Sequence, residues 1–114
     1  MLTVTVIGSR NFEPLSKVKE YLDTLKSLVP EFWIISGGAQ GVDAAAVLWG
    51  DANDMKYRVI RPRNPGRREE YLYRNVEMIA MADVVVAFWD GESTGTAFGI
   101  QYAKDSKKPL VVIQ

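Results

Sequence analysis

The sequence predicts an α/β fold built on a parallel β-sheet, and two observations carry that prediction. Five short apolar runs rich in valine and isoleucine recur along the 114 residues without the clean alternation of a half-exposed strand, which is typical of strands covered on both faces. Segments of helical length separate these runs. Because strand and helix alternate strictly, we expect parallel strands joined by right-handed crossovers. A chain of this length argues for one domain, residues 1–114.

The predicted strands are the apolar runs at residues 2–8, 32–36, 57–60, 83–89 and 109–114. The predicted helices lie between them, at residues 14–29, 42–52, 66–82 and 95–106. The stretch 61–66 is rich in proline and arginine and ends in glycine, so it is predicted to be a loop between the third strand and the third helix.

The four predicted helices differ in how strongly the sequence supports them. In the first, apolar side chains recur at spacings of three and four behind Pro14, which indicates an amphipathic helix. The second is small and apolar, which suits close packing on a sheet. The fourth contains Gly99, which lowers its helix propensity. The third helix has one side made of Tyr71, Leu72, Asn75, Met78 and Ile79.

Composition excludes several classes of protein. The chain has no cysteine and no histidine, so disulfide frameworks, thiolate metal sites and histidine-dependent triads are excluded, and no metal or cofactor is predicted. Its 14 basic and 14 acidic residues cancel, which does not favour nucleic acid as a partner. No apolar run reaches the roughly 18 residues of a membrane span, and the first residues do not resemble a signal peptide. We therefore expect a cytoplasmic protein without a membrane partner.

In open parallel sheets, ligands bind beyond the carboxyl ends of the strands, so the segments that follow the strands are the informative ones. Four segments follow the first four strands, at residues 8–12, 36–43, 61–68 and 89–99. Three of them are rich in small and polar residues, whereas 61–68 is rich in arginine. Because all four converge on one edge, we expect the ligand there.

The segment after the second strand, SGGAQGVD, looks like a phosphate loop. No Lys-Ser or Lys-Thr pair follows a glycine, which excludes a Walker-type loop, and Ser36 stands where a dinucleotide-binding loop begins with glycine. Arg61 follows the third strand where such folds carry an acid, so a nicotinamide-dependent dehydrogenase is not expected. Gly37, Gly38 and Gly41 would let backbone N–H groups approach a phosphate at a helix start. The alternative is a tight turn that binds nothing.

Two helix starts offer further groups for a phosphorylated ligand. Asp43, in the first turn of the second helix, either balances the helix dipole or accepts a hydrogen bond from a ribose or base. At the fourth helix, Gly95 and Thr96 offer backbone N–H groups and a hydroxyl. Ser93 and Thr94 are further donors, and either is a suitable N-cap. The alternative there is an ordinary capped helix start.

Arginines gather in one stretch, since six of the seven lie between residues 58 and 74. A guanidinium suits phosphate, whereas a mixed charge cluster is usually a solvated surface. We expect ligand contacts only from Arg10, which follows the first strand directly, and from Arg74, which has Asn75 beside it on a helix at the same edge.

The stretches VIGSR, ISGGAQGVDAAA, RNVEMIAMADVVVAFWDG and STGT, in this order, resemble the SLOG superfamily. That superfamily joins the DNA-processing protein A (Smf) proteins and the lonely-guy phosphoribohydrolases. The resemblance is strongest to its small stand-alone branch, the YspA-type, YpsA-related SLOG proteins, and it covers nearly the whole chain. It implies a Rossmann-like three-layer domain with a five-stranded parallel sheet in the order 3-2-1-4-5. It also implies a ligand that is a nucleotide, a nucleotide derivative or nucleic acid.

Carried over by position, the resemblance implies a set of ligand-binding residues along the carboxyl edge. They are Gly8, Ser9, Arg10, Ser36, Gly37, Gly38, Ala39, Gly41, Asp43, Arg74, Asn75, Asp90, Ser93, Gly95 and Thr96. Two departures from the resemblance matter. Gly99 stands where the lonely-guy enzymes carry a catalytic glutamate. The chain also lacks the histidine that usually follows the glycine-rich segment in the DNA-processing proteins.

The first functional hypothesis is a binding module that senses or sequesters a nucleotide or nucleotide derivative, with its phosphate on the segments 36–41 and 93–96. The second is a nucleoside-phosphate hydrolase of phosphoribohydrolase type. In that case Arg74 would hold the phosphate and Asp43 or Asp90 would be the acid–base group, provided that burial raises its pKa.

The third hypothesis is single-stranded nucleic-acid binding through the arginines at 58–74, which the neutral charge does not favour. Among the aromatic residues, Trp33 and Phe88 are expected in the core and Trp89 near a ligand. Homo-oligomerisation through helix surfaces is left open.

Overall fold

The computed structural model describes residues 1–114 and confirms the alternation of five strands and four helices. In chain order the elements are β1 (Leu2–Gly8), α1 (Ser16–Leu28), β2 (Phe32–Ser36), α2 (Val42–Ala52), β3 (Tyr57–Val59), α3 (Arg68–Ala80), β4 (Val84–Phe88), α4 (Thr94–Asp105) and β5 (Leu110–Ile113). The predicted bounds of β1, β2 and α2 are confirmed. The first helix begins at Ser16 rather than at Pro14, and the last three strands are one or two residues shorter than predicted.

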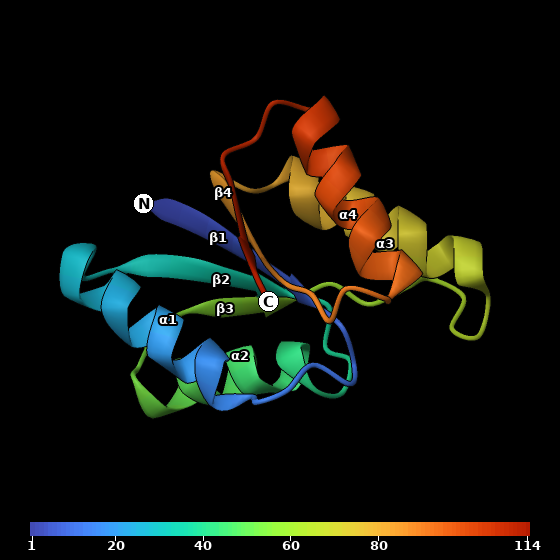
Figure 1. Cartoon of the computed structure of the whole chain (residues 1–114). Helices are drawn as coiled ribbons and strands as arrows, with labels where there is room; N and C mark the ends of the chain where they lie inside the picture. Colours follow the sequence, from blue (N-terminus) through green and yellow to red (C-terminus); the bar gives the residue numbers. More distant parts are fainter.

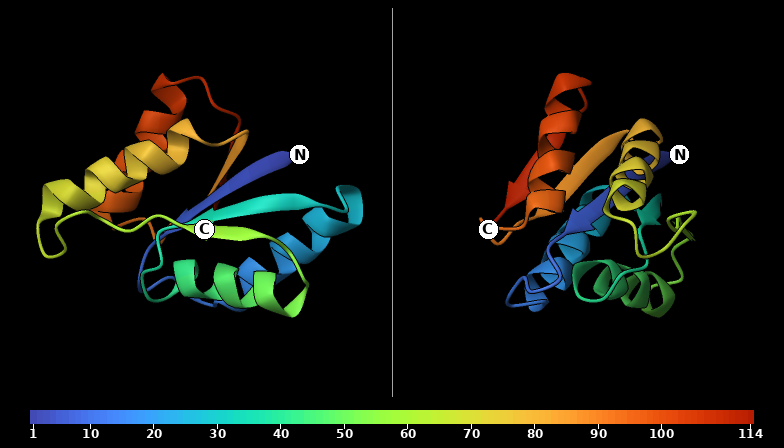
Figure 2. Two further views of the ribbon diagram at one scale, coloured as in Figure 1. Left: turned by 180° about the vertical axis from the view of Figure 1, so that it is seen from behind. Right: turned by 90° about the vertical axis from the view of Figure 1, so that its right-hand side faces the viewer.

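All four strand pairs are parallel, and the sheet order is β3-β2-β1-β4-β5. This is the order that the resemblance implied. Figures 1 and 2 show three layers, with α1 and α2 against one face of the sheet and α3 and α4 against the other. The strand order reverses between β1 and β4, so the crevice where such folds bind ligands lies beyond the carboxyl ends of these two strands.

Alternate residues of the central strands build the two halves of the core. On β1, Val4 and Val6 pack with the residues of α1 and α2, whereas Ile7 packs with those of α3 and α4. On β4, Phe88 belongs to the first cluster and Ala87 to the second. This period of two follows from the pleat of the strand. Each fully buried large apolar side chain stabilises the fold by about 1.5–3 kcal/mol, so both helix pairs are held firmly on the sheet.

Two glycines let the helices approach β1 closely. A Cβ on Gly8 would lie 2.5 Å from the Cβ of Val42, at the start of α2. A Cβ on Gly99 would lie 2.7 Å from Cδ1 of Ile7, so the glycine that lowers the helix propensity of α4 is required for its packing. No helix combines the length and the apolar character that a membrane crossing needs.

Candidate functional site

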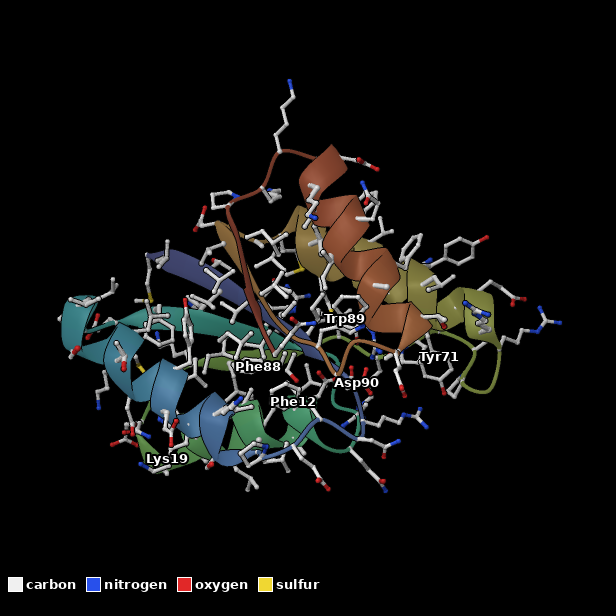
Figure 3. All side chains as sticks on the ribbon, in the orientation of Figure 1. Phe12, Lys19, Tyr71, Phe88, Trp89 and Asp90 are labelled. Atoms are coloured by element: carbon white, nitrogen blue, oxygen red, sulfur yellow. The ribbon has the colours of Figure 1, made fainter.

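A cleft of about 670 Å³ opens at the carboxyl edge of the sheet. Its walls come from the end of β1, the loop between β2 and α2 with the first turn of α2, one side of α3, and the segment from β4 into α4. Tyr71 and Asp90, labelled in Figure 3, belong to two of these walls. The expected residues that line the cleft are Gly8, Arg10, Ala39, Asp43, Arg74, Asn75, Asp90, Ser93, Gly95 and Thr96. The expected residues that do not line it are Ser9, Ser36, Gly37, Gly38 and Gly41.

Sequence reasoning missed part of the lining. It did not select Asn11, Arg68 or Glu92, and it assigned Tyr71, Leu72 and Met78 only to a helix face. The arginine cluster at 58–74 was the one signal that could have found Arg68. Spacing alone did not separate this arginine from its solvated neighbours.

The glycine loop (residues 36–41) is occupied by the protein's own groups. The N–H of Gly38 donates to Oγ of Ser36 at 3.3 Å, and the N–H of Ala39 donates to Oδ2 of Asp43 at 3.2 Å. The Ser36 hydroxyl in turn donates to the carbonyl of Asp43 at 3.0 Å. A carboxylate of the chain therefore lies where a phosphate oxygen would lie in a phosphate-binding loop.

The glycines of this loop make room for neighbouring protein atoms. A Cβ on Gly37 would lie 2.6 Å from Cζ of Arg74 and 2.8 Å from Oδ2 of Asp43. Gly41 has a φ of 80°, and its Cβ would lie 2.6 Å from the carbonyl oxygen of Arg10. The loop is glycine-rich because the chain packs closely around it.

Asp43 is a buried carboxyl group on the cleft wall, with only 6% of its surface exposed. Burial raises its pKa to about 6, against the opposing effects of the Ala39 hydrogen bond and of the charges on Arg74 and Arg10. The group therefore exchanges its proton near neutral pH, which is the property that a general acid or base requires.

Arg74 ties together the ends of two strands. Its Nη1 donates to the carbonyl of Gly37 at 2.7 Å and to that of Ile60 at 3.4 Å, and its Nε donates to Oδ1 of Asn75 at 3.1 Å. The side chain is 8% exposed, and burial lowers its pKa. Its Nη2 makes no hydrogen bond within the protein, and no fully buried side-chain nitrogen lacks a partner, so Nη2 reaches solvent.

The β4–α4 loop (residues 89–93) is organised by Asp90. Its Oδ1 accepts the N–H groups of Glu92 at 2.9 Å and Ser93 at 2.8 Å, and these bonds hold the pKa of Asp90 below its ordinary value. The N–H of Asp90 donates to Oγ of Ser9 at 3.2 Å, and this hydroxyl donates to Oγ1 of Thr96 at 3.4 Å. The buried Ser9 thus joins the end of β1 to the loop and to α4.

The first turn of α4 is open to the cleft. No side chain caps the helix. The N–H groups of Thr94, Gly95 and Thr96 have no hydrogen-bond partner in the protein, and all three residues line the cleft. A Cβ on Gly95 would meet no atom within 4 Å. Free N–H groups at the positive end of a helix dipole attract an anion.

Three aromatic expectations have different outcomes. Phe88 is fully buried, as expected. Trp33 was expected in the core but is only partly buried, with Nζ of Lys56 5.6 Å from its ring. Trp89 was expected near a ligand but does not line the cleft, and its Nε1 donates to the carbonyl of Ser93 at 3.0 Å.

The charges that line the cleft are balanced. The cationic side chains are those of Arg10, Arg68 and Arg74, and the carboxyl groups are those of Asp43, Asp90 and Glu92. No group of three acidic side chains is close enough to hold a metal ion. The cleft therefore contains both cations that can bind an anion and carboxyl groups that can accept hydrogen bonds from a ligand.

Comparison with protein families gives one match: the YspA, cpYpsA-related SLOG family matches residues 2–64, more than half of the chain. No curated protein matches the chain. Among solved structures, DNA processing protein A (DprA) from Streptococcus pneumoniae superposes with a TM-score of 0.83 at 19% identity, over 100% of this chain and 50% of that one. The chain thus spans about half the length of that protein.

Two further structures share the fold. DNA processing protein A from Helicobacter pylori, solved for its single-stranded DNA binding mode, superposes with a TM-score of 0.75 at 26% identity, over 97% of this chain and 64% of that one. The protein TM1055 superposes with a TM-score of 0.74 at 24% identity, over 96% of this chain and 72% of that one.

Proposed function

This chain belongs to the YspA, cpYpsA-related SLOG family, and we propose that it binds a nucleotide or a nucleotide-derived ligand in the cleft. The observation that carries the proposal is the open start of α4. Its three free N–H groups line the same cleft as the side chains of Arg10, Arg68 and Arg74. Such an arrangement of donors and guanidinium groups suits a phosphate.

The rest of the cleft suits the other parts of a nucleotide. Tyr71 and Leu72, both partly exposed, line one wall and offer an apolar surface to a base. The Asp90 and Glu92 carboxylates can accept hydrogen bonds from ribose hydroxyls or from a base amino group. A volume of about 670 Å³ lies within the range of roughly 300–1,000 Å³ found for small-molecule sites.

Under this proposal, residues 1–114 act as one ligand-binding domain, and the protein senses or sequesters its ligand in the cytoplasm. The phosphate lies at residues 94–96 rather than on the glycine loop. In the glycine loop, two of the N–H groups already have protein acceptors.

A thermal-shift screen tests the proposal. The panel is mononucleotides, ADP-ribose, NAD, cyclic nucleotides and a short single-stranded DNA, each at two salt concentrations. A ligand at 100 times its dissociation constant should add about 2.7 kcal/mol of stability. Gly95→Val, which puts a branched side chain into the cleft, should abolish the shift. Ala97→Val, on the same helix but outside the cleft, should retain it. If no nucleotide shifts the wild-type protein, the proposal fails.

A second candidate function is hydrolysis of a nucleoside phosphate, and the pKa of about 6 at Asp43 favours it. The lonely-guy mechanism does not transfer directly, because Gly99 stands where those enzymes carry the catalytic glutamate. A side chain at this position would collide with Ile7. Chromatography of nucleoside 5′-monophosphates incubated with the protein decides between the candidates. Release of free base that is lost in Asp43→Asn would establish the hydrolase, whereas binding without release supports the binding module.

Single-stranded nucleic acid is the third candidate partner. Beside the cleft lies a groove of about 450 Å³ that contains Arg61 and Arg63 and shares Arg74 with the cleft. The balance of 14 basic and 14 acidic residues works against a strong electrostatic contribution. Binding of the DNA that weakens steeply with salt, without any shift by mononucleotides, would favour this candidate.

A further inference from the structure

Arg68 and Thr94 begin two different helices and meet across the mouth of the cleft. Arg68 is the first residue of α3 and Thr94 the first of α4, and both line the cleft. Nη2 of Arg68 donates to Oγ1 of Thr94 at 3.2 Å. This is the only hydrogen bond that links the two helix starts.

No carboxylate of the protein neutralises the Arg68 guanidinium. The two ion pairs of the chain lie elsewhere and do not include it. Two of the three carboxylates of the cleft are already engaged, since Asp43 accepts the N–H of Ala39 and Asp90 accepts two backbone N–H groups. Arg68 is therefore a cation at the cleft whose only partner is neutral.

A threonine hydroxyl is a weak partner for such a cation. It takes one of the five N–H donors of a guanidinium, whereas a phosphate accepts two in parallel with charge assistance. Both Arg68 and Thr94 are exposed, so breaking their contact leaves no buried group unpaired. A phosphate bound at the start of α4 would therefore replace Thr94 as the partner of Arg68.

Arg74 differs from Arg68 in this respect. Its Nη1 and Nε are committed to Gly37, Ile60 and Asn75, and its side chain is 92% buried (8% exposed). Only Nη2 remains free on the cleft wall. Arg74 thus offers one fixed donor nitrogen, whereas the Arg68 guanidinium can follow the ligand.

We propose that Arg68 and Thr94 form a clasp, in which Arg68 exchanges the Thr94 hydroxyl for a terminal phosphate and the site thereby selects phosphomonoesters over phosphodiesters. This inference rests on the proposed nucleotide site and deepens it. A phosphomonoester near neutral pH is largely a dianion with three free oxygens. These can face the N–H groups of Gly95 and Thr96 and the guanidinium together. A phosphodiester has one charge and one free oxygen fewer, so it loses one of these partners.

Isothermal titration calorimetry of the full chain tests the clasp. The ligands are nucleoside 5′-monophosphates and the corresponding 3′,5′-cyclic monophosphates, which are phosphodiesters. Wild type should prefer the monoester by at least about tenfold, which is the size of one charge-assisted hydrogen bond. Arg68→Gln should weaken monoester binding about tenfold and change diester binding little, so the preference disappears. Arg67→Gln, a neighbouring exposed arginine outside the cleft, is the matched control and should behave as wild type.

Thr94→Val separates a clasp from a structural tie between the helices. Because Thr94 competes with the ligand for Arg68, its loss should leave monoester affinity unchanged or raise it up to about threefold. If the pair is only a structural tie, Arg68→Gln and Thr94→Val will weaken both ligands alike, and the proposal is overturned. Urea denaturation of each variant confirms that it is folded.

The remaining outcomes separate the clasp from the proposed function. Nucleotide binding with no monoester preference, or with a preference that persists in Arg68→Gln, overturns the clasp and leaves the nucleotide site standing. Inorganic phosphate that binds as tightly as the nucleotides, and is lost in Arg68→Gln, supports the clasp but contradicts a nucleotide as the ligand. If none of these ligands binds, both proposals fail.

Discussion

Two strand-to-helix turns face the same edge of the sheet, and they differ in what fills them. In the glycine loop before α2, the N–H groups of Gly38 and Ala39 already donate to protein oxygens. At the start of α4, three N–H groups have no partner, and Gly95 has open space beside it. The difference teaches that glycine content does not identify a phosphate site. What matters is whether the protein has already supplied the acceptor.

The two helices also differ in whether an acidic residue lies in the first turn. The first turn of α2 contains an acid, Asp43, whereas the first turn of α4 contains none. A carboxylate in the first turn compensates the positive end of the dipole. In α2 the chain provides its own anion, and in α4 that position is left for a ligand under our proposal.

The largest effect is expected at Gly41, where a positive φ is combined with a close contact to backbone atoms. Its positive φ and the carbonyl oxygen of Arg10, 2.6 Å from the position of a Cβ, leave no room for a side chain. Gly41→Ala should lower the free energy of unfolding by about 2–4 kcal/mol, through backbone strain and overpacking. The measurement is urea denaturation monitored by circular dichroism.

Gly95→Ala is the matched variant in the open turn. Because its Cβ would meet no atom within 4 Å, it should change the free energy of unfolding by less than about 1 kcal/mol, and in the stabilising direction. Equal losses of stability for Gly41→Ala and Gly95→Ala would break the comparison between a filled and an open turn.

Asp43→Asn removes the anion that fills the glycine loop. The folded pKa of about 6 lies above the ordinary aspartate pKa of 3.8, so the folded state binds the proton more tightly than the unfolded state. The free energy of unfolding therefore falls as pH rises from about 4 to about 6. Above that range the buried carboxylate is fully charged, and its destabilising effect no longer changes with pH. Asp43→Asn should raise the free energy of unfolding at pH 8 by up to about 3 kcal/mol and have little effect near pH 4.

Urea denaturation between pH 4 and pH 8 measures this difference. Glu31→Gln, at an exposed carboxyl group, is the control and should show no comparable gain. A destabilised Asp43→Asn variant at pH 8 would mean that the buried charge holds the glycine loop together more strongly than burial opposes it.

At Asp90 the effect of pH has the opposite sign. Hydrogen bonds from Ser93 and Glu92 lower the pKa of this carboxyl group, so its carboxylate stabilises the fold above the unfolded pKa. That contribution is lost as pH falls through the lowered folded pKa. Asp90→Ala should therefore cost more stability at pH 7 than in acid, in the same series of unfolding curves. A loss independent of pH would show that the loop does not depend on the charge.

The alternation of apolar runs and helical segments predicted the parallel α/β sheet, and the resemblance to the SLOG superfamily implied the strand order that the structure shows. The strand ends were less well defined. Ile60 was assigned to the third strand, yet β3 ends at Val59, although the N–H of Ile60 still donates to the carbonyl of Ser36 at 2.8 Å. Ile60 thus keeps one backbone hydrogen bond to the last residue of β2, although it lies just after the end of β3.

The edge that holds the cleft was also predictable, because parallel strands must end on one side. Which turn stays open was not. The N–H groups of the glycine loop are satisfied by Ser36 and Asp43, which are close along the chain, but the residue pattern left open whether Asp43 would serve the helix or a ligand. The bond from Arg74 to the carbonyl of Gly37 joins residues 37 positions apart, and no local pattern records that contact. Arg68 and Arg74 look alike in the sequence, but Arg68 is exposed whereas Arg74 is only 8% exposed. Arg68 is the first residue of α3, whereas Arg74 lies within the helix and donates to the carbonyls of Gly37 and Ile60.

The most direct test is an NMR titration of the ¹⁵N-labelled protein with a nucleoside 5′-monophosphate, following the backbone amides of both turns. Our account predicts that the amide resonances of Gly95 and Thr96 move most, whereas those of Gly38 and Ala39 move little because their N–H groups already have acceptors. If the resonances of Gly38 and Ala39 move most and those of Gly95 and Thr96 stay in place, the phosphate binds the glycine loop and the account is wrong.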